Sequence, residues 1–166
     1  MKTDSKIIIG AIVVSLFIIV GAVIAFSNDK SPKRENLGNA TLTIDKKFED
    51  FGTMKGDEEK TAIFTITNTS TSSVLRIWNV ATSCDCTFAT VTIDGKETSE
   101  FNMPMHMTGS LKNWIGEVAP QKQATLKVTY RPKVMPVTGE VTRQVTFATN
   151  DPQNETVEVS VKANVL

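Results

Sequence analysis

The feature that most constrains this chain is an uncharged apolar run near its start. Residues 7–26 read IIIGAIVVSLFIIVGAVIAF and contain no charged side chain in twenty positions. An α-helix of that length spans roughly 30 Å, which matches the hydrocarbon core of a bilayer. The apolar part of a cleaved signal peptide is shorter, about 7–15 residues. The run therefore predicts an uncleaved transmembrane anchor in the lipid bilayer, preceded by a short tail, residues 1–6.

Cleavage and orientation are less constrained than the span itself. Ala25 and Ser27 are small residues of the kind found at signal-peptide cleavage sites, so a cleaved leader stays an alternative. Basic residues near a span set its orientation, but Lys2 and Lys6 on one side nearly balance the Lys30–Arg34 cluster on the other. We expect a single-pass protein of the cytoplasmic membrane, with its tail inside and its large C-terminal domain extracytoplasmic.

The remainder of the chain divides into a linker and one domain. Residues 27–40 are polar, contain Pro and Gly and lack periodicity, which is typical of a linker. Residues 41–166 are enough for one domain. Eighteen basic and eighteen acidic residues cancel over the whole chain, and no basic stripe is present. This balance argues against nucleic acid as a partner, because its binding requires many neutralised phosphates.

After residue 41 the pattern changes to short segments in which apolar and polar residues alternate. These segments are rich in Val, Ile, Thr and aromatic residues and end at turn residues, which is the signature of strands. They cover residues 61–67, 74–80, 124–130, 141–148 and 156–165. Together they predict an all-β, antiparallel β-sandwich. The predicted core residues are Phe51, Phe64, Ile66, Leu75, Ile77, Leu126, Val128, Val145, Phe147 and Val159.

Four groups of residues occur in the order typical of one bacterial family. They are Phe48–Gly52 with Ile63–Thr69, then Ser83–Thr87, then Val118–Pro120, and last Thr149–Pro152. Over residues 44–165 the chain resembles the domain of unknown function 1573 family, which is related to the Hydin-type immunoglobulin-like domains. The resemblance implies an immunoglobulin-like β-sandwich in a mostly extracytoplasmic protein, and it implies no common activity. The family typically has Gly where Asp85 and Gln121 stand here.

The chain has two cysteines, Cys84 and Cys86, one residue apart. In an extended strand their Cβ atoms would lie about 7 Å apart, whereas a disulfide needs roughly 3.5–4.5 Å. A bond therefore requires the chain to curl at Asp85, a residue that tolerates turns. Three states stay open: two thiols, a reducible disulfide, or two thiolates on a metal. The plainer alternative is a pair of small packed residues, and redox exchange would need a basic neighbour that the sequence does not place.

A second concentration of soft ligands lies at residues 103–107, which read MPMHM. Three of the six methionines and the only histidine fall within these five positions. In a strand the methionines would share one face and His106 would point away from them. Pro104 and Gly109 instead favour an irregular loop, residues 94–113, in which thioethers and imidazole converge. The alternative is that the methionines simply pack in the core.

Thiolate, thioether and imidazole ligands together suit Cu(I). The predicted metal site therefore consists of Cys84, Cys86, Met103, Met105, His106 and Met107. Zinc fits less well, because structural zinc usually takes four Cys or His ligands and this chain has three. Trp114, just beyond the loop, is expected to pack in the core rather than to cover a cation.

The sequence does not support an enzyme. Its single histidine has no accompanying nucleophile signature, and no Gly-rich phosphate loop is present. The sequence therefore predicts a membrane-anchored, non-enzymatic module that binds or transfers Cu(I). The alternative is a structural domain that docks an envelope protein through an exposed strand edge, without metal.

Overall fold

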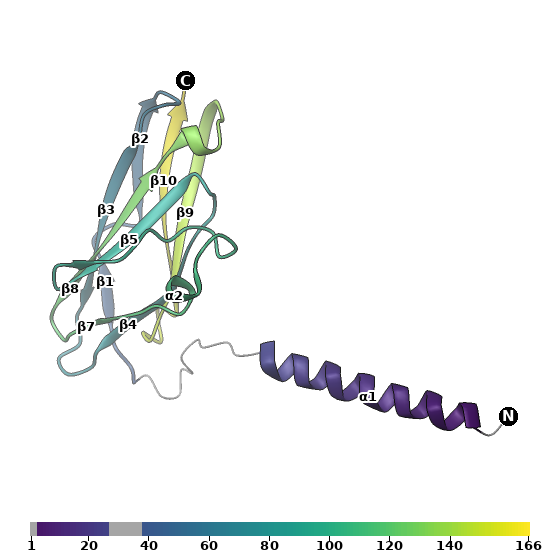
Figure 1. Ribbon diagram of the computed structural model, residues 1–166. Coiled ribbons are helices and arrows are strands. Elements are labelled where there is room, and N and C mark those ends of the chain that lie inside the picture. The colour runs from purple at the N-terminus through teal and green to yellow at the C-terminus, as the bar shows by residue number, and fades with distance from the viewer. Residues whose placement is uncertain (1–2, 27–37) are drawn as a thin grey trace. The chain divides into compact units, whose positions relative to one another are not determined.

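The computed structural model describes residues 3–26 and 38–166, which belong to two separate units. The first unit contains one helix, α1 (Thr3–Phe26), so the helix expected over residues 7–26 is present (Figure 1). Within the described residues, no helix is both long enough and apolar enough to cross a membrane. Membrane anchoring thus stays a prediction. The predicted linker, residues 27–40, lies outside the described residues except for its last three positions.

The second unit consists of two five-stranded sheets (Figure 1). The order in the first sheet is β1 (Leu42–Ile44), β3 (Lys60–Asn68), β8 (Gln123–Tyr130), β5 (Thr87–Ile93) and β6 (Lys96–Glu97). The order in the second sheet is β2 (Phe48–Met54), β10 (Thr156–Val165), β9 (Gly139–Thr149), β4 (Leu75–Thr82) and β7 (Ile115–Val118). Two short helices, α2 (Gly109–Lys112) and η2 (Pro132–Val134), lie in the connections. The predicted β-sandwich is confirmed.

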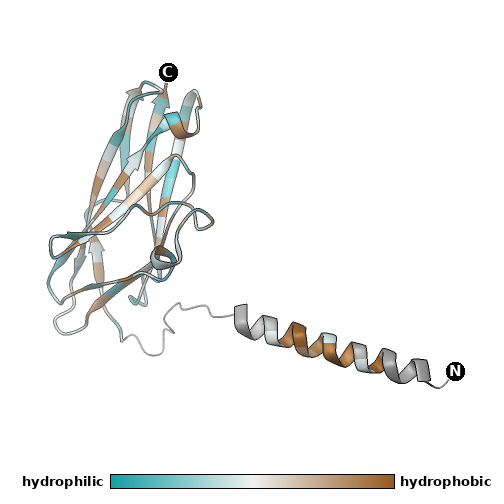
Figure 2. Ribbon diagram, viewed as in Figure 1, coloured by the Kyte–Doolittle hydropathy of each residue, from teal (hydrophilic) through white to brown (hydrophobic). Residues whose placement is uncertain are grey.

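Alternating side chains explain why these segments form strands and where the core lies. Along β3, Ala62, Phe64 and Ile66 are buried while Ile63 is exposed, as a strand with one face on a core requires. Figure 2 shows this alternation as brown and teal segments that follow one another along the strands. Nine of the ten predicted core residues are buried, and Phe51 is partly buried against the same cluster.

The strand predictions are correct for the long strands and incomplete for the short ones. The five predicted segments correspond to β3, β4, β8, β9 and β10, whereas β1, β2, β5, β6 and β7 were not predicted. One pairing also corrects the expectation of a wholly antiparallel sandwich, because β2 runs parallel to β10. These two strands stand near opposite ends of the domain sequence, so no hairpin dictates their direction, and the whole intervening chain serves as the crossover.

The cysteines lie where the chain passes from one sheet to the other. Strand β4 belongs to the second sheet, in which Thr82 pairs with Val145 of β9. Strand β5 belongs to the first sheet, in which Thr87 pairs with Tyr130 of β8. Residues 83–86 therefore form a corner between the sheets, and we call these four residues the cysteine corner.

Candidate functional site

The cysteine corner is closed by a disulfide between Cys84 and Cys86, whose Cα atoms are 5.2 Å apart. The curl that the bond requires is thus present around Asp85. The Cys84 carbonyl oxygen accepts hydrogen bonds from the Thr87 N–H at 3.0 Å and from the Thr82 hydroxyl at 3.0 Å. Of the three states that the sequence left open, the structure contains the disulfide, and neither cysteine is free.

The two sulfur atoms have different surroundings. Cys84 is 7% exposed, and its Sγ lies 3.8 Å from the Sδ of Met135, which is itself 51% exposed. The Cys86 N–H donates to the Cys84 Sγ at 3.1 Å. Cys86 is 0% exposed. Both cysteines are therefore buried, but Cys84 keeps a small exposed fraction next to an exposed methionine.

A positive charge is directed at the buried sulfur. The Arg143 Nε lies 3.2 Å from the Cys86 Sγ, and its guanidinium stands 5.7 Å from the centre of the Tyr130 ring. Within the described part of the chain, no carboxylate forms an ion pair with Arg143. Arg143 is thus the basic neighbour that redox chemistry requires and that the sequence analysis did not place.

The sequence contained a signal for Arg143. In β9, buried Val141 and Val145 lie two residues before and after Arg143, so all three side chains share the inward face of the strand. On a strand face that packs on the core, a charged residue between apolar residues is uncommon unless its charge has a partner. That irregularity in the pattern marks Arg143, although it does not indicate which group the guanidinium contacts.

Residues 103–107 are irregular, as predicted, although β6 and α2 lie within the loop expected at residues 94–113. The methionine-bearing segment reaches the cysteine corner through polar atoms. The His106 Nδ1 is hydrogen-bonded to the Asp85 carboxylate, and the His106 N–H donates to the Met103 carbonyl at 2.9 Å. The Asn102 side chain donates to the carbonyl oxygens of Asp85 at 3.1 Å and Thr87 at 3.2 Å. The loop therefore lies against the corner, with His106 on the side of Asp85.

The predicted metal ligands are brought together only in part. The structure joins Cys84 and Cys86 directly and places His106 beside the intervening Asp85. Met105 is 72% exposed. The thioether at the cysteine pair is that of Met135, which the sequence analysis did not include.

The two remaining loop methionines are both partly buried. Met107 is packed against the hydrophobic core, and Met103 is half-buried. In the described ranges, no group of three or more His, Cys, Asp and Glu side chains could hold a metal ion.

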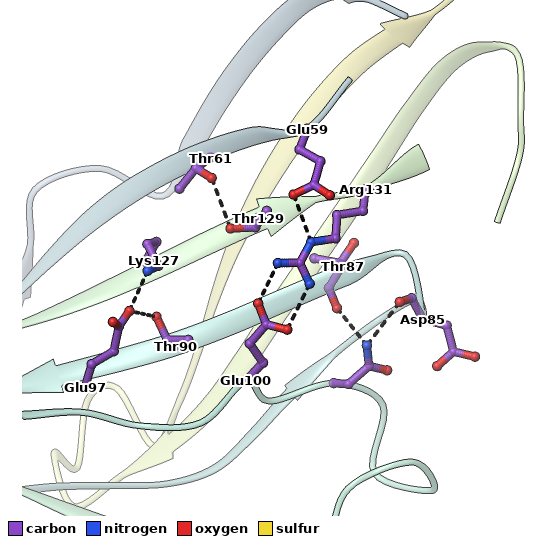
Figure 3. A network of polar contacts seen from close by, with 11 residues as sticks. Glu59, Thr61, Asp85, Thr87, Thr90, Glu97, Glu100, Lys127, Thr129 and Arg131 are labelled. Atoms are coloured by element: carbon purple, nitrogen blue, oxygen red, sulfur yellow. Dashed lines mark hydrogen bonds and ion pairs between the residues drawn. The ribbon is translucent and has the colours of Figure 1, made fainter. Parts of the chain in front are cut away.

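Arg131 anchors both the corner and the loop (Figure 3). Its backbone N–H donates to the Cys86 carbonyl at 2.8 Å. Its guanidinium forms a fork on the Glu100 carboxylate at 2.8 and 2.6 Å, donates to Glu59 at 3.0 Å and covers the Phe88 ring at 4.3 Å. The hydrogen bonds with Glu100 hold the pKa of Arg131 above its ordinary value, against the opposing effect of burial, and Glu59 adds to the rise. The charge of Arg131 is therefore neutralised by Glu100 and Glu59, and its role is to hold these segments together.

An open pocket of about 380 Å³ adjoins the corner. It is lined by Asp85, Phe88, Glu100, Asn102, His106 and Val134. Val134 is 49% exposed and precedes Met135, so an apolar rim runs from this pocket to the Cys84 sulfur. The pocket is thus open to solvent beside the corner.

A second hollow, of about 600 Å³, has Trp114 and Leu111 in its lining. Trp114 packs edge-to-face on buried Phe101 with ring centres 5.3 Å apart, as predicted for a packing role. A Cβ on Gly116 would lie 2.4 Å from the Trp114 ring, so glycine is required there for that packing. No cysteine or histidine lines this hollow, and it is separate from the corner.

The Thr149–Pro152 group is structural. The buried Asn150 side chain accepts from the Arg76 N–H at 2.8 Å and donates to the Val74 carbonyl at 3.0 Å. The Asp151 carboxylate, also buried, accepts from the Leu42 N–H at 3.0 Å. These contacts fix the starts of β1 and β4 and leave no reactive group available.

Solved structures with a similar fold include a protein of unknown function and an enzyme. A protein of unknown function from Porphyromonas gingivalis W83 matches with a TM-score of 0.55 and 19% identity, over 82% of this chain and 51% of that one. This chain thus spans about half the length of that protein. A family 123 glycoside hydrolase from Clostridium perfringens matches with a TM-score of 0.52 and 8% identity, over 78% and 27% of the two chains. At these identities the likeness concerns the β-sandwich fold alone.

A PapD-like domain of human CEP192 also matches, with a TM-score of 0.47 and 10% identity, over 75% of this chain and 84% of that one. None of the curated proteins compared with this chain matches it. The sequence model of one family, described as "Protein of unknown function (DUF1573)", matches residues 42–113. That segment includes the cysteine corner and the methionine-bearing loop, and over it this chain is similar to the DUF1573 family.

Proposed function

We propose that this chain is a membrane-anchored, non-enzymatic binding module with a Hydin-type immunoglobulin-like domain outside the cytoplasm. Residues 7–26 insert in the lipid bilayer, which their uncharged apolar sequence supports. The disulfide supports the extracytoplasmic location, because disulfides persist in oxidising compartments and are rare in the cytosol. The site of binding is the cysteine corner.

The ligand of the reduced corner is Cu(I), and the contact between Cys84 and Met135 is the observation that carries this proposal. Reduction of the disulfide yields two thiolates, and the Met135 thioether already lies 3.8 Å from the Cys84 Sγ. Thiolate and thioether ligands together suit Cu(I). Structural Zn²⁺ usually takes four Cys or His ligands, and Mg²⁺ prefers oxygen ligands. Two thiolates and one Cu(I) carry a net negative charge, which the nearby Arg143 guanidinium offsets.

The loop residues Met103, Met105, His106 and Met107 remain a secondary ligand group in this proposal. His106 contacts Asp85 at the centre of the corner, and Met105 is open to solvent on the same loop. Exposed thioether and imidazole groups beside a dithiolate suit delivery or release of a soft ion. This arrangement supports transfer of Cu(I) as well as its storage.

The test is competition between the reduced full-length protein in detergent and a Cu(I) chelator of known affinity. We expect one Cu(I) per chain. Replacement of both cysteines by Ser removes the binding, and Met135→Leu weakens it by about tenfold, because Leu conserves volume but provides no donor. Met105→Leu is the matched control and has a smaller effect.

Two outcomes would contradict the assignment. Equal affinity of the Met135→Leu variant and the unchanged protein would remove Met135 from the ligand set. Affinity no greater than that of an unstructured Cys-Xaa-Cys peptide would remove the copper site altogether. The alternative, a metal-free domain that docks an envelope protein through a strand edge, would then account for the module.

A further inference from the structure

The Cys84–Cys86 disulfide is polarised by its surroundings. Cys84 is 7% exposed and lies beside half-exposed Met135, whereas Cys86 is 0% exposed. The Arg143 Nε donates to the Cys86 Sγ at 3.2 Å, and the Thr87 hydroxyl lies 3.9 Å from the same sulfur. Of the two cysteines, Cys84 is thus the less deeply buried, and Cys86 is the one adjacent to a cation.

We propose that this disulfide accepts two electrons from the dithiol of a partner protein by thiol–disulfide exchange. The partner attacks the Cys84 Sγ, and Cys86 is the leaving group. This inference goes beyond the binding of Cu(I), because it concerns the oxidised corner and requires no metal.

The direction of the reaction follows from access and charge. A thiolate must approach the attacked sulfur along the axis of the disulfide, and only Cys84 has exposed surface. Exchange is faster when the leaving thiolate is stabilised. The Arg143 N–H and its positive charge supply that stabilisation to Cys86. The opposite cleavage would leave a Cys84 thiolate with one backbone donor, the Cys86 N–H.

The reaction balances with the partner dithiol as the reductant. In the first step a partner thiolate bonds to the Cys84 Sγ, the Cys84–Cys86 bond breaks, and its electron pair remains on the Cys86 sulfur. In the second step the partner's second thiolate attacks the partner's first cysteine sulfur, which is bonded to Cys84 in the mixed disulfide. The Cys84 thiolate is thereby released. The partner leaves as a disulfide, and its two protons pass to the two cysteines of the corner.

The surface around Cys84 favours a protein over a small thiol as the partner. Met135, which contacts the Cys84 sulfur, and the adjacent Val134 are large apolar side chains that are 51% and 49% exposed. Exposed apolar groups that cluster beside a reactive atom are typical of contact with another protein. The open pocket that Val134 lines, together with Asp85 and His106, gives room for an extended segment of the partner.

The test uses the oxidised full-length protein in detergent and two probes, a reduced Cys-Xaa-Xaa-Cys peptide with apolar flanks and glutathione. We expect the peptide to reduce the corner faster than glutathione at equal thiol concentration. Arg143→Gln lowers the rate of reduction by the peptide about tenfold. It lowers the ratio of reduced to oxidised protein at equilibrium by a similar factor, because a charge-assisted hydrogen bond to the leaving thiolate is lost. Arg143→Lys restores most of both. Arg76→Gln, in which the altered side chain pairs with Glu117, is the matched control and changes neither.

Trapping identifies the attacked sulfur without any change at Arg143. In the Cys86→Ser variant, an activated peptide disulfide forms a stable mixed disulfide with Cys84, and in the Cys84→Ser variant buried Cys86 reacts at least tenfold more slowly. Equal reaction of the two variants would overturn the proposal, as would unchanged rate and equilibrium in a folded Arg143→Gln variant. Cu(I) affinity, measured separately on the reduced protein, shows whether the binding proposal stands or fails independently.

Discussion

The cysteine corner and the end of the sandwich that holds Asn150 and Asp151 both join distant segments through side chains. At the Asn150 end, buried amide and carboxylate oxygens meet backbone N–H groups of β1 and β4. At the cysteine corner, the buried Cys86 sulfur meets a guanidinium that has no carboxylate partner in the described part of the chain. The first arrangement satisfies each polar group that it buries, whereas the second leaves a charge directed at a reducible bond.

This difference separates structural motifs from reactive ones. Buried polar groups that are fully matched lower the free energy of the folded state and leave no capacity for a ligand. An unneutralised cation near a sulfur atom stabilises the thiolate more than the disulfide, so its effect appears in chemistry rather than in stability. We therefore expect substitutions at the Asn150 end to change unfolding and substitutions at the corner to change reactivity.

The largest expected effect concerns the core that both regions share. Phe64→Ala removes a fully buried ring and should cost about 3–5 kcal/mol of the free energy of unfolding. Ile63→Ala, at the neighbouring exposed position, should cost less than about 1 kcal/mol. Denaturant unfolding followed by tryptophan fluorescence measures both. If the corner became accessible to thiol reagents at much lower denaturant than the fluorescence change, the two regions would not share one cooperative core.

Asp151 provides the next effect, which depends on pH. Burial raises the pKa of Asp151, but hydrogen bonds from Asn154, Leu42 and Gln153 outweigh it, and the net pKa is lowered. The folded carboxyl therefore binds a proton less readily than the unfolded one. Its stabilisation is complete above the unfolded pKa of about 3.9 and is lost as the pH falls through the folded value.

Asp151→Asn should accordingly cost about 2 kcal/mol at pH 7, because it removes a charged acceptor from buried N–H donors. Below pH 3 the difference between the variant and the unchanged protein should shrink. Urea unfolding at a series of pH values measures it. A difference that stays constant across this range would show that the carboxylate charge contributes nothing to this end of the sandwich.

The third effect is at the corner itself and is smaller. Replacement of Cys84 and Cys86 by Ser should cost about 1–2 kcal/mol, because a disulfide that closes a three-residue loop restricts the unfolded chain little. Thermal unfolding of the oxidised protein and of this variant compares them. A loss as large as that for Phe64→Ala would mean that the corner is a structural clamp, which would remove the contrast with the Asn150 end.

The strands that could be predicted are those whose pattern is long and one-sided. In β3 and β10 every second residue is buried over nine or ten positions, so periodicity alone identifies them. Strand β1 has three residues and β6 has two, which is too short for a period to be counted. Strand β2 has mostly exposed or half-buried residues, because it lies at the edge of its sheet.

The candidate site could be predicted as a location but not as a set of contacts. The spacing of Cys84 and Cys86 indicated a turn at Asp85, and the MPMHM segment indicated an irregular loop, and both are present. Met135 and Arg143 lie 51 and 57 residues beyond their cysteine partners. Such contacts depend on how β9 and the segment before it pack against the corner, and no local pattern contains that information.

The smallest expected effect compares the two positions at which glycine is typical of the family. Gln121 has a φ of +62°, a conformation that costs a residue with a side chain about 1 kcal/mol relative to Gly. Its side chain offsets this cost by donating to the Thr69 and Ser70 carbonyls at 2.8 and 3.0 Å. Asp85 has no such backbone conformation, and its carboxylate contacts His106.

Gln121→Ala should therefore cost about 1 kcal/mol, since it keeps the strained backbone and loses both hydrogen bonds. Gln121→Gly should recover most of that loss, because glycine adopts a positive φ freely. Asp85→Gly should instead cost up to about 1 kcal/mol, because it removes the partly exposed contact with His106 and adds flexibility to the unfolded chain. Thermal unfolding of the three variants under oxidising conditions gives the order. A stabilising Asp85→Gly would show that the corner, like the Gln121 turn, is shaped by a backbone requirement rather than by the side chains that surround the disulfide.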